Sequence, residues 1–177
     1  MNFERLKNNI ISLVEEQQYK LGYRSEPVRL YYPLKSLNRL LNTSGDPSEM
    51  KETLEKFAAF AEDDLGKIQV TSEKERFCIR LPKEASDFVH TLGDRDPFLK
   101  KLIQLVGTHG TAMEQVLELF RETSESVVIE KKIHGEFDYL CFFPDGDPDD
   151  FRYCLTDEGC HVIYHRFTPE DYIDCEF

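Results

Sequence analysis

The sequence has no apolar run close to the roughly 20 residues that a membrane-spanning helix needs, although 40% of its residues are hydrophobic. Its first residues, Met1 to Lys7, lack the apolar core of a signal peptide. The five cysteines are scattered, odd in number and without a Cys-x-x-Cys pair, which indicates reduced thiols and no disulfide framework. These absences predict a cytoplasmic protein that does not enter a membrane.

The sequence also lacks the motifs of the large enzyme classes. It contains no glycine-rich phosphate loop, no nucleophile elbow and no His-Glu-x-x-His helix. The remaining catalytic candidates are His161, His165 and Asp171, because a histidine near an acid or a cysteine can act as a base or activate a nucleophile. The five histidines are scattered without a motif. We therefore expect a non-enzymatic protein and keep a small enzyme built on these three residues as an alternative.

Two metal-binding hypotheses fail on spacing. Zinc-type ligands occur at Cys154, Cys160, His161 and His165. On one strand His161 and His165 would stand roughly 13 Å apart, at about 3.3 Å per residue, and Cys160 would point to the other face. The acidic run 145–150 begins like a calcium loop, but Asp150 and Thr156 occupy the positions that require glycine and glutamate. We expect no metal and no cofactor.

The net charge is −12, from 34 acidic and 22 basic residues, and a strong negative field repels phosphate backbones. The distribution is uneven. Residues 1–45 carry seven basic against four acidic residues, a balance of +3, whereas residues 136–177 carry twelve acids against two arginines, a balance of −10. The acidic field favours solubility or cationic partners.

Basic and aromatic residues interleave near the N-terminus and supply the interaction candidates, which are Lys20, Tyr23, Arg24, Arg29, Tyr31, Lys35 and Arg39. Such a segment can bind phosphates and stack on bases, contact another protein, or form a solvated face that packs against the acidic C-terminal half. We expect an unidentified protein partner. A nucleic acid is the alternative that the net charge disfavours, and no membrane partner is expected.

The stretch 48–82 organises the first half of the chain. Met50, Leu54 and Phe57 recur at helical spacing, which predicts a helix capped by Ser48 and ended by Gly66. Alternating apolar residues at 68–70 and 77–81 then predict a hairpin around a polar loop at 71–75. Further helices are predicted at 3–21, 34–41 and 84–92, and residues 23–33 predict an extended connector or a short strand.

This order of elements resembles a winged-helix domain over residues 1–93. In that family the helix before the hairpin often enters the DNA major groove, and the hairpin forms the wing. Here that helix carries six acids against Lys51 and Lys56 only, so it lacks the positive charge that phosphate binding needs. The hairpin is more basic, with Lys67, Lys74, Arg76 and Arg80.

The second half predicts two helices and then strands. Helices are expected at 98–106 and 111–122, the second with a capping box of Thr111 and Glu114. Enrichment in β-branched and aromatic residues predicts strands at 127–132, 137–143, 152–155 and 161–167, with a terminal helix capped by Thr168. The expected fold is α+β, with helix-plus-hairpin units at 1–93 and 94–177 and a four-strand antiparallel meander in the second; whether they pack as one globule is left open.

Four segments resemble an uncharacterised bacterial family, a domain of unknown function: 21–41, 135–139, 152–154 and 158–167. The resemblance covers nearly the whole chain and implies no activity, ligand or catalytic residue. Our leading hypothesis is therefore a cytoplasmic interaction or regulatory module whose contact surfaces are residues 19–39 and the acidic meander around 145–174. The alternatives are a winged-helix nucleic-acid binder, which would use residues 20–39 and the hairpin, and the small enzyme.

Overall fold

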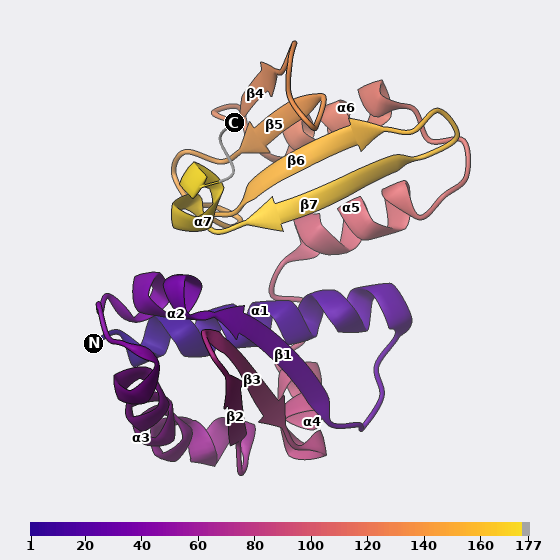
Figure 1. Ribbon diagram of the computed structural model, residues 1–177. Helices are drawn as coiled ribbons and strands as arrows, with labels where there is room; N and C mark the ends of the chain where they lie inside the picture. The colour runs from indigo at the N-terminus through magenta and orange to yellow at the C-terminus, as the bar shows by residue number, and fades with distance from the viewer. Residues whose placement is uncertain (175–177) are drawn as a thin grey trace. The chain divides into compact units, whose positions relative to one another are not determined.

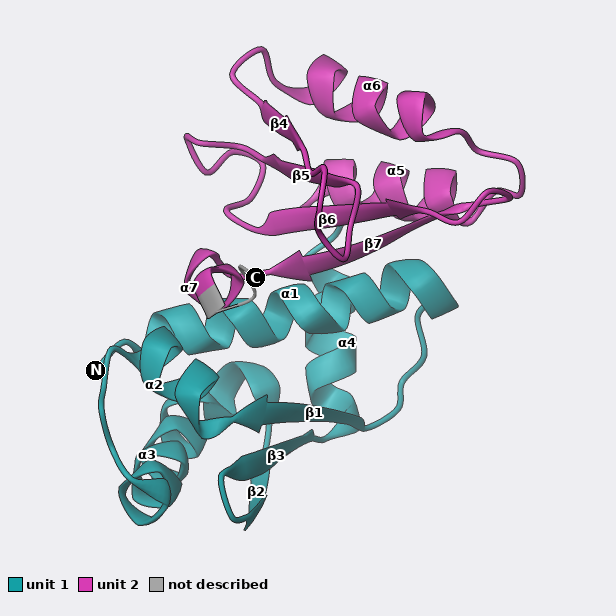
Figure 2. Cartoon of the chain, turned by 45° about the horizontal axis from the view of Figure 1, so that its top comes forward, with its two compact units in different colours: residues 1–93 teal, residues 94–177 magenta. Residues whose placement is uncertain are grey.

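Helices and antiparallel strands both run through the chain, which confirms the expected α+β class (Figure 1). The structure is a computed structural model and describes residues 1–174. The chain divides into two units, Met1–Gly93 and Asp94–Phe177, each with its own helices and its own sheet (Figure 2).

Unit 1 follows the order helix, strand, helix, helix, hairpin, helix, which contains the predicted pair of helices before a hairpin. Its elements are α1 (Phe3–Leu21), β1 (Val28–Pro33), α2 (Leu34–Leu41), α3 (Pro47–Leu65), β2 (Gln69–Glu73), β3 (Arg76–Leu81) and α4 (Lys83–Thr91). The three strands form an antiparallel sheet in the order β1-β3-β2. The connector at 23–33 thus contributes a full strand, which completes the hairpin sheet.

Helix α3 begins two residues earlier than expected, and the assignment of Ser48 as its cap is wrong. Asp46 is the N-cap: its Oδ1 accepts a hydrogen bond from the Glu49 N–H at 2.9 Å, and Glu49 Oε2 accepts one from the Asp46 N–H at 2.9 Å. Pro47 fits the first helical position because a proline has no N–H to leave unbonded there. Gly66 ends the helix with a φ of 71°, as expected.

The hairpin is tighter than its sequence predicts. The loop expected at 71–75 is only the two-residue turn Lys74–Glu75, because β2 continues to Glu73 and pairs it with Arg76. Lys74 has a φ of 56°, in the left-handed region that a two-residue hairpin turn requires.

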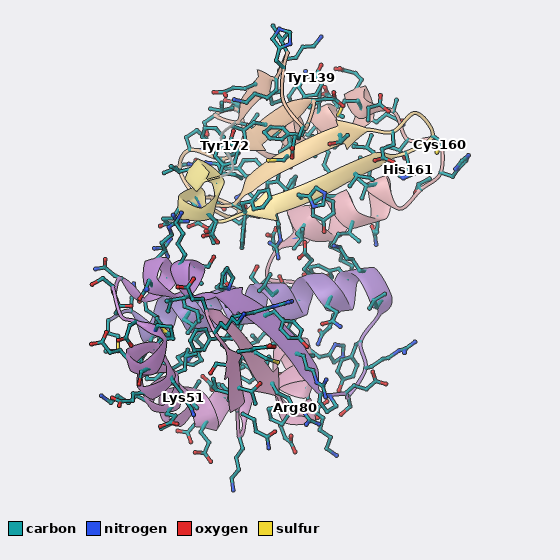
Figure 3. The ribbon with its side chains drawn as sticks, viewed as in Figure 1. Lys51, Arg80, Tyr139, Cys160, His161 and Tyr172 are labelled. Carbon is teal, nitrogen blue, oxygen red and sulfur yellow. The ribbon has the colours of Figure 1, made fainter. Side chains whose placement is uncertain are left out.

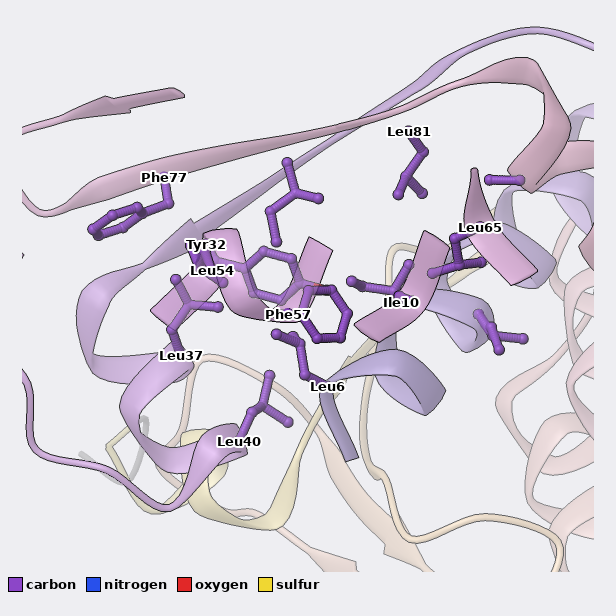
Figure 4. Packing of buried hydrophobic residues seen from close by; sticks show 14 of the residues in the cluster. Leu6, Ile10, Tyr32, Leu37, Leu40, Leu54, Phe57, Leu65, Phe77 and Leu81 are labelled. Atoms are coloured by element: carbon purple, nitrogen blue, oxygen red, sulfur yellow. The ribbon is translucent and has the colours of Figure 1, made fainter. Parts of the chain in front are cut away.

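The core of unit 1 lies under one face of its sheet (Figure 4). Leu6 and Ile10 from α1, Phe57 from α3, and Phe77 and Leu81 from β3 are all completely buried. Burying a side chain of this size contributes about 1.5–3 kcal/mol. The opposite face of the sheet is left to solvent.

Unit 2 places two helices before a four-strand antiparallel sheet. Its elements are α5 (Pro97–Val106), α6 (Met113–Thr123), β4 (Val128–Lys131), β5 (Tyr139–Phe142), β6 (Arg152–Asp157), β7 (Val162–Phe167) and α7 (Pro169–Asp174). The sheet order β4-β5-β6-β7 confirms the expected meander. Phe98 of α5 packs edge-on against Phe120, Phe143 and Tyr153 at centroid distances of 4.9 to 5.5 Å.

The capping box expected at the start of α6 is wrong. The hydroxyl of Thr111 is hydrogen-bonded to the carbonyls of Leu105 at 2.8 Å and Thr108 at 3.0 Å, so it closes the loop between α5 and α6. The side chain of Gln115 instead accepts a bond from the Ala112 N–H at 2.8 Å. By contrast, the hydroxyl of Thr168 accepts from the Asp171 N–H at 3.2 Å, as a cap of α7 should.

Candidate functional site

The exposed face of the unit 1 sheet gathers basic and polar side chains from all three strands. Side chains alternate between the faces of a strand, so Phe77, Ile79 and Leu81 are buried while Arg76 and Arg80 are exposed. We call this surface the arginine face and define it by Arg29 and Tyr31 of β1, Gln69, Thr71 and Glu73 of β2, and Arg76, Cys78 and Arg80 of β3.

The turn sets the hydrogen-bond pattern across the sheet. In a two-residue hairpin the residues that flank the turn, here Glu73 and Arg76, exchange backbone hydrogen bonds. Toward β1, Arg76 is therefore in a non-hydrogen-bonded pair with Pro33. The Leu34 N–H donates to the Glu75 carbonyl at 2.7 Å, which is where this pattern places the next bond. Cys78 and Arg80, the next alternate residues of β3, are likewise in non-hydrogen-bonded pairs with residues of β1.

Arg29 and Arg80 face each other across β1 and β3 in such a non-hydrogen-bonded pair. The Cα atoms of such pairs lie roughly 4.5 Å apart, closer than those of hydrogen-bonded pairs. Two like charges in this position repel and destabilise the sheet. Neither arginine forms an ion pair within residues 1–174. The sheet thus places two arginines directly opposite each other, neither of them in an ion pair in the part of the chain that the structure describes.

Arg76 extends this positive surface toward the turn. Its guanidinium lies 4.7 Å from the centroid of the Tyr31 ring, a cation–π arrangement that orients the group. Glu73 is its cross-strand neighbour, but the two form no ion pair. One carboxylate therefore accompanies three arginines on the arginine face.

The arginine face is hollowed. An open depression of about 610 Å³ is lined by Arg29, Arg76, Arg80 and the side chains between them. Figure 3 labels Arg80, which marks the β3 part of this surface. Guanidinium groups bind carboxylates and phosphates through paired hydrogen bonds. The arrangement can therefore hold an anionic group against the sheet.

The structure brings together two of the seven expected interaction residues, Arg29 and Tyr31. Lys20 is in the last turn of α1, 3.9 Å from Glu16. Arg24 is exposed in the connector before β1, and the remaining two basic residues, Lys35 and Arg39, lie on α2. Sequence reasoning named Arg76 and Arg80 only as part of the hairpin that a nucleic-acid binder would use, and it did not place them beside Arg29 and Tyr31, because one sequence does not show that β1 pairs with β3.

Tyr23 is held on α4. Its ring stacks on His90 with centroids 3.8 Å apart, and its hydroxyl donates to Asp87 Oδ1 at 2.5 Å. This hydrogen bond raises the pKa of Tyr23, and together with one from Ser25 it lowers the pKa of Asp87. Tyr23 therefore anchors the connector between α1 and β1.

The outer surface of α3, the helix that precedes the hairpin, is negative. Its exposed acids are Glu49, Glu52, Glu55, Glu62 and Asp63. Asp64 is paired with Lys7 of α1 at 2.7 Å. A surface of this sign repels a nucleic-acid backbone.

In unit 2 the structure brings Cys160 and His161 together, 3.0 Å apart from Sγ to Nδ1 (Figure 3). The expectation that they point to opposite faces is wrong, because His161 precedes β7 and both residues belong to the turn between β6 and β7. Cys160 is exposed in that turn.

The other catalytic candidates lie on separate elements. His165 is exposed on β7, opposite the buried Cys154 of β6, and Asp171 is in the first turn of α7. Among residues 1–174, no group of three or more His, Cys, Asp or Glu side chains could hold a metal ion. These elements assemble no recognisable catalytic constellation in the described chain.

The acidic run 145–150 contains one carboxyl group that is turned inward. Asp149 accepts hydrogen bonds from the Tyr153 hydroxyl at 2.6 Å and from the Phe151 N–H at 3.1 Å. Burial and a hydrogen bond with Asp96 raise the pKa of Asp149 to about 8. Asp96 is itself 8% exposed and caps α5 by accepting from the Leu99 N–H at 3.0 Å. The pattern of the sequence does not reveal this pair.

A family model described as "Domain of unknown function, E. rectale Gene description (DUF3877)" matches residues 3–175. No curated protein and no solved structure matches the chain. In residues 1–174, no helix combines the length and the apolar character that crossing a membrane requires.

Proposed function

Because the chain belongs to the DUF3877 family, a bacterial family of unknown function, we propose a function from its geometry alone. We propose that the protein is a non-enzymatic interaction module whose arginine face binds an acidic segment of another protein. The observation that carries this proposal is the pair Arg29 and Arg80, two directly opposed cations that form no ion pair within residues 1–174. An anionic partner would relieve their repulsion.

The charge of the chain favours a protein partner over a nucleic acid. The whole chain carries a net charge of −12 and the exposed side of α3 is acidic, and both features repel a nucleic-acid backbone. A short acidic segment needs only the depression on the arginine face, which is lined by three arginines. We place this module in the cytoplasm, in keeping with free thiols at Cys78, Cys141, Cys154 and Cys160.

One observation favours a second candidate, a winged-helix nucleic-acid binder. The element order of unit 1 puts the β2–β3 hairpin where the wing of that family lies, and the hairpin carries Lys74 at its tip as well as Arg76 and Arg80. This candidate would use the same arginines, so it is tested as a separate outcome of the experiment below.

The test measures binding of a labelled peptide in which glutamate and threonine alternate, by fluorescence anisotropy. We expect Arg29→Glu/Arg80→Glu to weaken binding by at least about tenfold, because charge-assisted hydrogen bonds contribute about 1.5–3 kcal/mol. The matched control is Lys51→Glu/Lys56→Glu, which makes the same charge change on exposed positions of α3 and should leave the affinity within about twofold of the wild type.

Two results would overturn the proposal. Equal losses in both double variants would show that only the net charge matters. Tight binding of a DNA duplex that weakens steeply with salt and is lost in Arg29→Glu/Arg80→Glu would favour the nucleic-acid binder instead.

A further inference from the structure

We propose that the acidic partner segment binds in an extended conformation, as a strand added antiparallel to the free edge of β2. This inference rests on the proposed function, since it assumes that the arginine face is the binding site. It adds the backbone geometry and the side-chain pattern of the partner.

The β2 edge has unused backbone groups. In the order β1-β3-β2, β2 is an outer strand, and within residues 1–174 it pairs with β3 alone. The hairpin pattern directs the N–H and C=O groups of Gln69, Thr71 and Glu73 toward β3. The same groups of Val70 and Ser72 therefore point away from the sheet. They can form the hydrogen bonds of an additional strand.

The edge is also accessible. Val70 is half-buried, and the other residues of β2, including Ser72, are exposed. The opposite edge, β1, is a poorer template because its outward backbone positions include Pro33, which has no N–H to donate. Backbone pairing therefore favours β2.

The arginine face determines which side chains the added strand should carry. Residues opposite Gln69 and Thr71 lie on the arginine face, and residues opposite Val70 and Ser72 lie on the other face. A partner glutamate opposite Thr71 would lie two strand spacings from β3, so its Cα atom would be roughly 10 Å from the Cα atoms of β3. A glutamate side chain and an arginine side chain that extend toward each other can bridge this distance. The partner should therefore alternate acidic residues with β-branched or polar residues, as strands prefer.

Backbone methylation of the probe tests this geometry. In the alternating glutamate–threonine peptide, the threonines would lie opposite Val70 and Ser72 and donate their N–H groups to β2, while the glutamate N–H groups would point away. We expect N-methylation of the threonines to weaken binding by at least about tenfold, and N-methylation of the glutamates to change it by less than about threefold.

A substitution in the protein gives an independent measurement. Ser72→Pro removes an N–H that points outward and spares the ladder to β3, so we expect at least about fivefold weaker binding with an unchanged circular dichroism spectrum. Ser72→Ala keeps this N–H and serves as the control, with the wild-type affinity expected. If Ser72→Pro fails to fold, the methylated peptides still test strand addition to β2.

The outcomes separate the two proposals. Equal binding of both methylated peptides, together with loss of binding in Arg29→Glu/Arg80→Glu, would overturn strand addition and leave the proposed function intact. Failure of the unmodified peptide to bind, or its indifference to the arginine substitutions, would overturn the proposed function and strand addition with it.

Discussion

At the scale of single residues, the Asp96–Asp149 pair makes the stability of the protein depend on pH. The pKa of Asp149 is about 8 in the folded protein, whereas an unfolded aspartate has a pKa of about 3.9. Between these values the folded state keeps a proton that the unfolded state releases. The stabilisation is therefore complete below about pH 4 and is lost as the pH rises to about 8, by at most about 1.4 kcal/mol per pH unit.

We predict that Asp96→Asn reduces the fall in the free energy of unfolding between pH 5 and pH 8. The asparagine side chain can still accept from the Leu99 N–H and cap α5, while its amide N–H can donate to an ionised Asp149. Urea unfolding at pH 5 to 8 measures the slope. Asp46→Asn makes the same substitution at the cap of α3, where the Asp46 and Glu49 carboxylates each accept a backbone N–H, and should keep the wild-type slope. Equal slopes in both variants would contradict the prediction.

At the scale of elements, the start of α3 shows how neighbouring residues compete for one role. Both Asp46 and Ser48 are good N-cap residues, and Pro47 lies between them. The Asp46 cap prevails because it gives proline the first helical position and lets Glu49 complete a capping box.

Replacing the true cap should therefore cost more than replacing the apparent one. We predict that Asp46→Ala lowers the free energy of unfolding by about 1 kcal/mol, since it leaves the Glu49 N–H without its acceptor. Ser48→Ala should change it by less than about 0.5 kcal/mol. Chemical denaturation monitored by circular dichroism checks both values. The assignment of the cap would be wrong if the order of the two effects were reversed.

At the scale of the whole molecule, each unit has its own apolar cluster. The cluster around Phe57 contains residues of unit 1 only, from Phe3 to Val89, and the cluster of Leu140, Cys154 and Tyr172 lies within unit 2. Each of these two clusters is thus made of side chains from one unit.

We predict that Phe57→Ala destabilises unit 1 selectively, by about 3–5 kcal/mol, because it opens a cavity at a completely buried position. Native-state hydrogen exchange should then accelerate at buried amides of residues 1–93 and remain close to wild type in residues 94–174. Phe60→Ala on the same helix is the control, since that ring is 44% exposed and should cost much less. Equal acceleration in both units would refute independent cores.

The sequence by itself determined the elements whose patterns are local. The helices at 3–21 and 34–41 have the predicted limits, and the Thr168 cap and the order of the four meander strands were predictable as well. Helical spacing, capping and strand alternation depend on residues within a few positions of each other. A single sequence therefore contains the information that they need.

Only the tertiary structure decided which residues from distant parts of the sequence contact each other. The opposition of Arg29 and Arg80 and the hydrogen bond between Asp96 and Asp149 both follow from how the chain folds back. Strand pairing joins residues that are distant in the chain, and one sequence does not specify their register before the strands find their neighbours. The arginine face exists because β1 pairs with β3, a contact that no local pattern encodes.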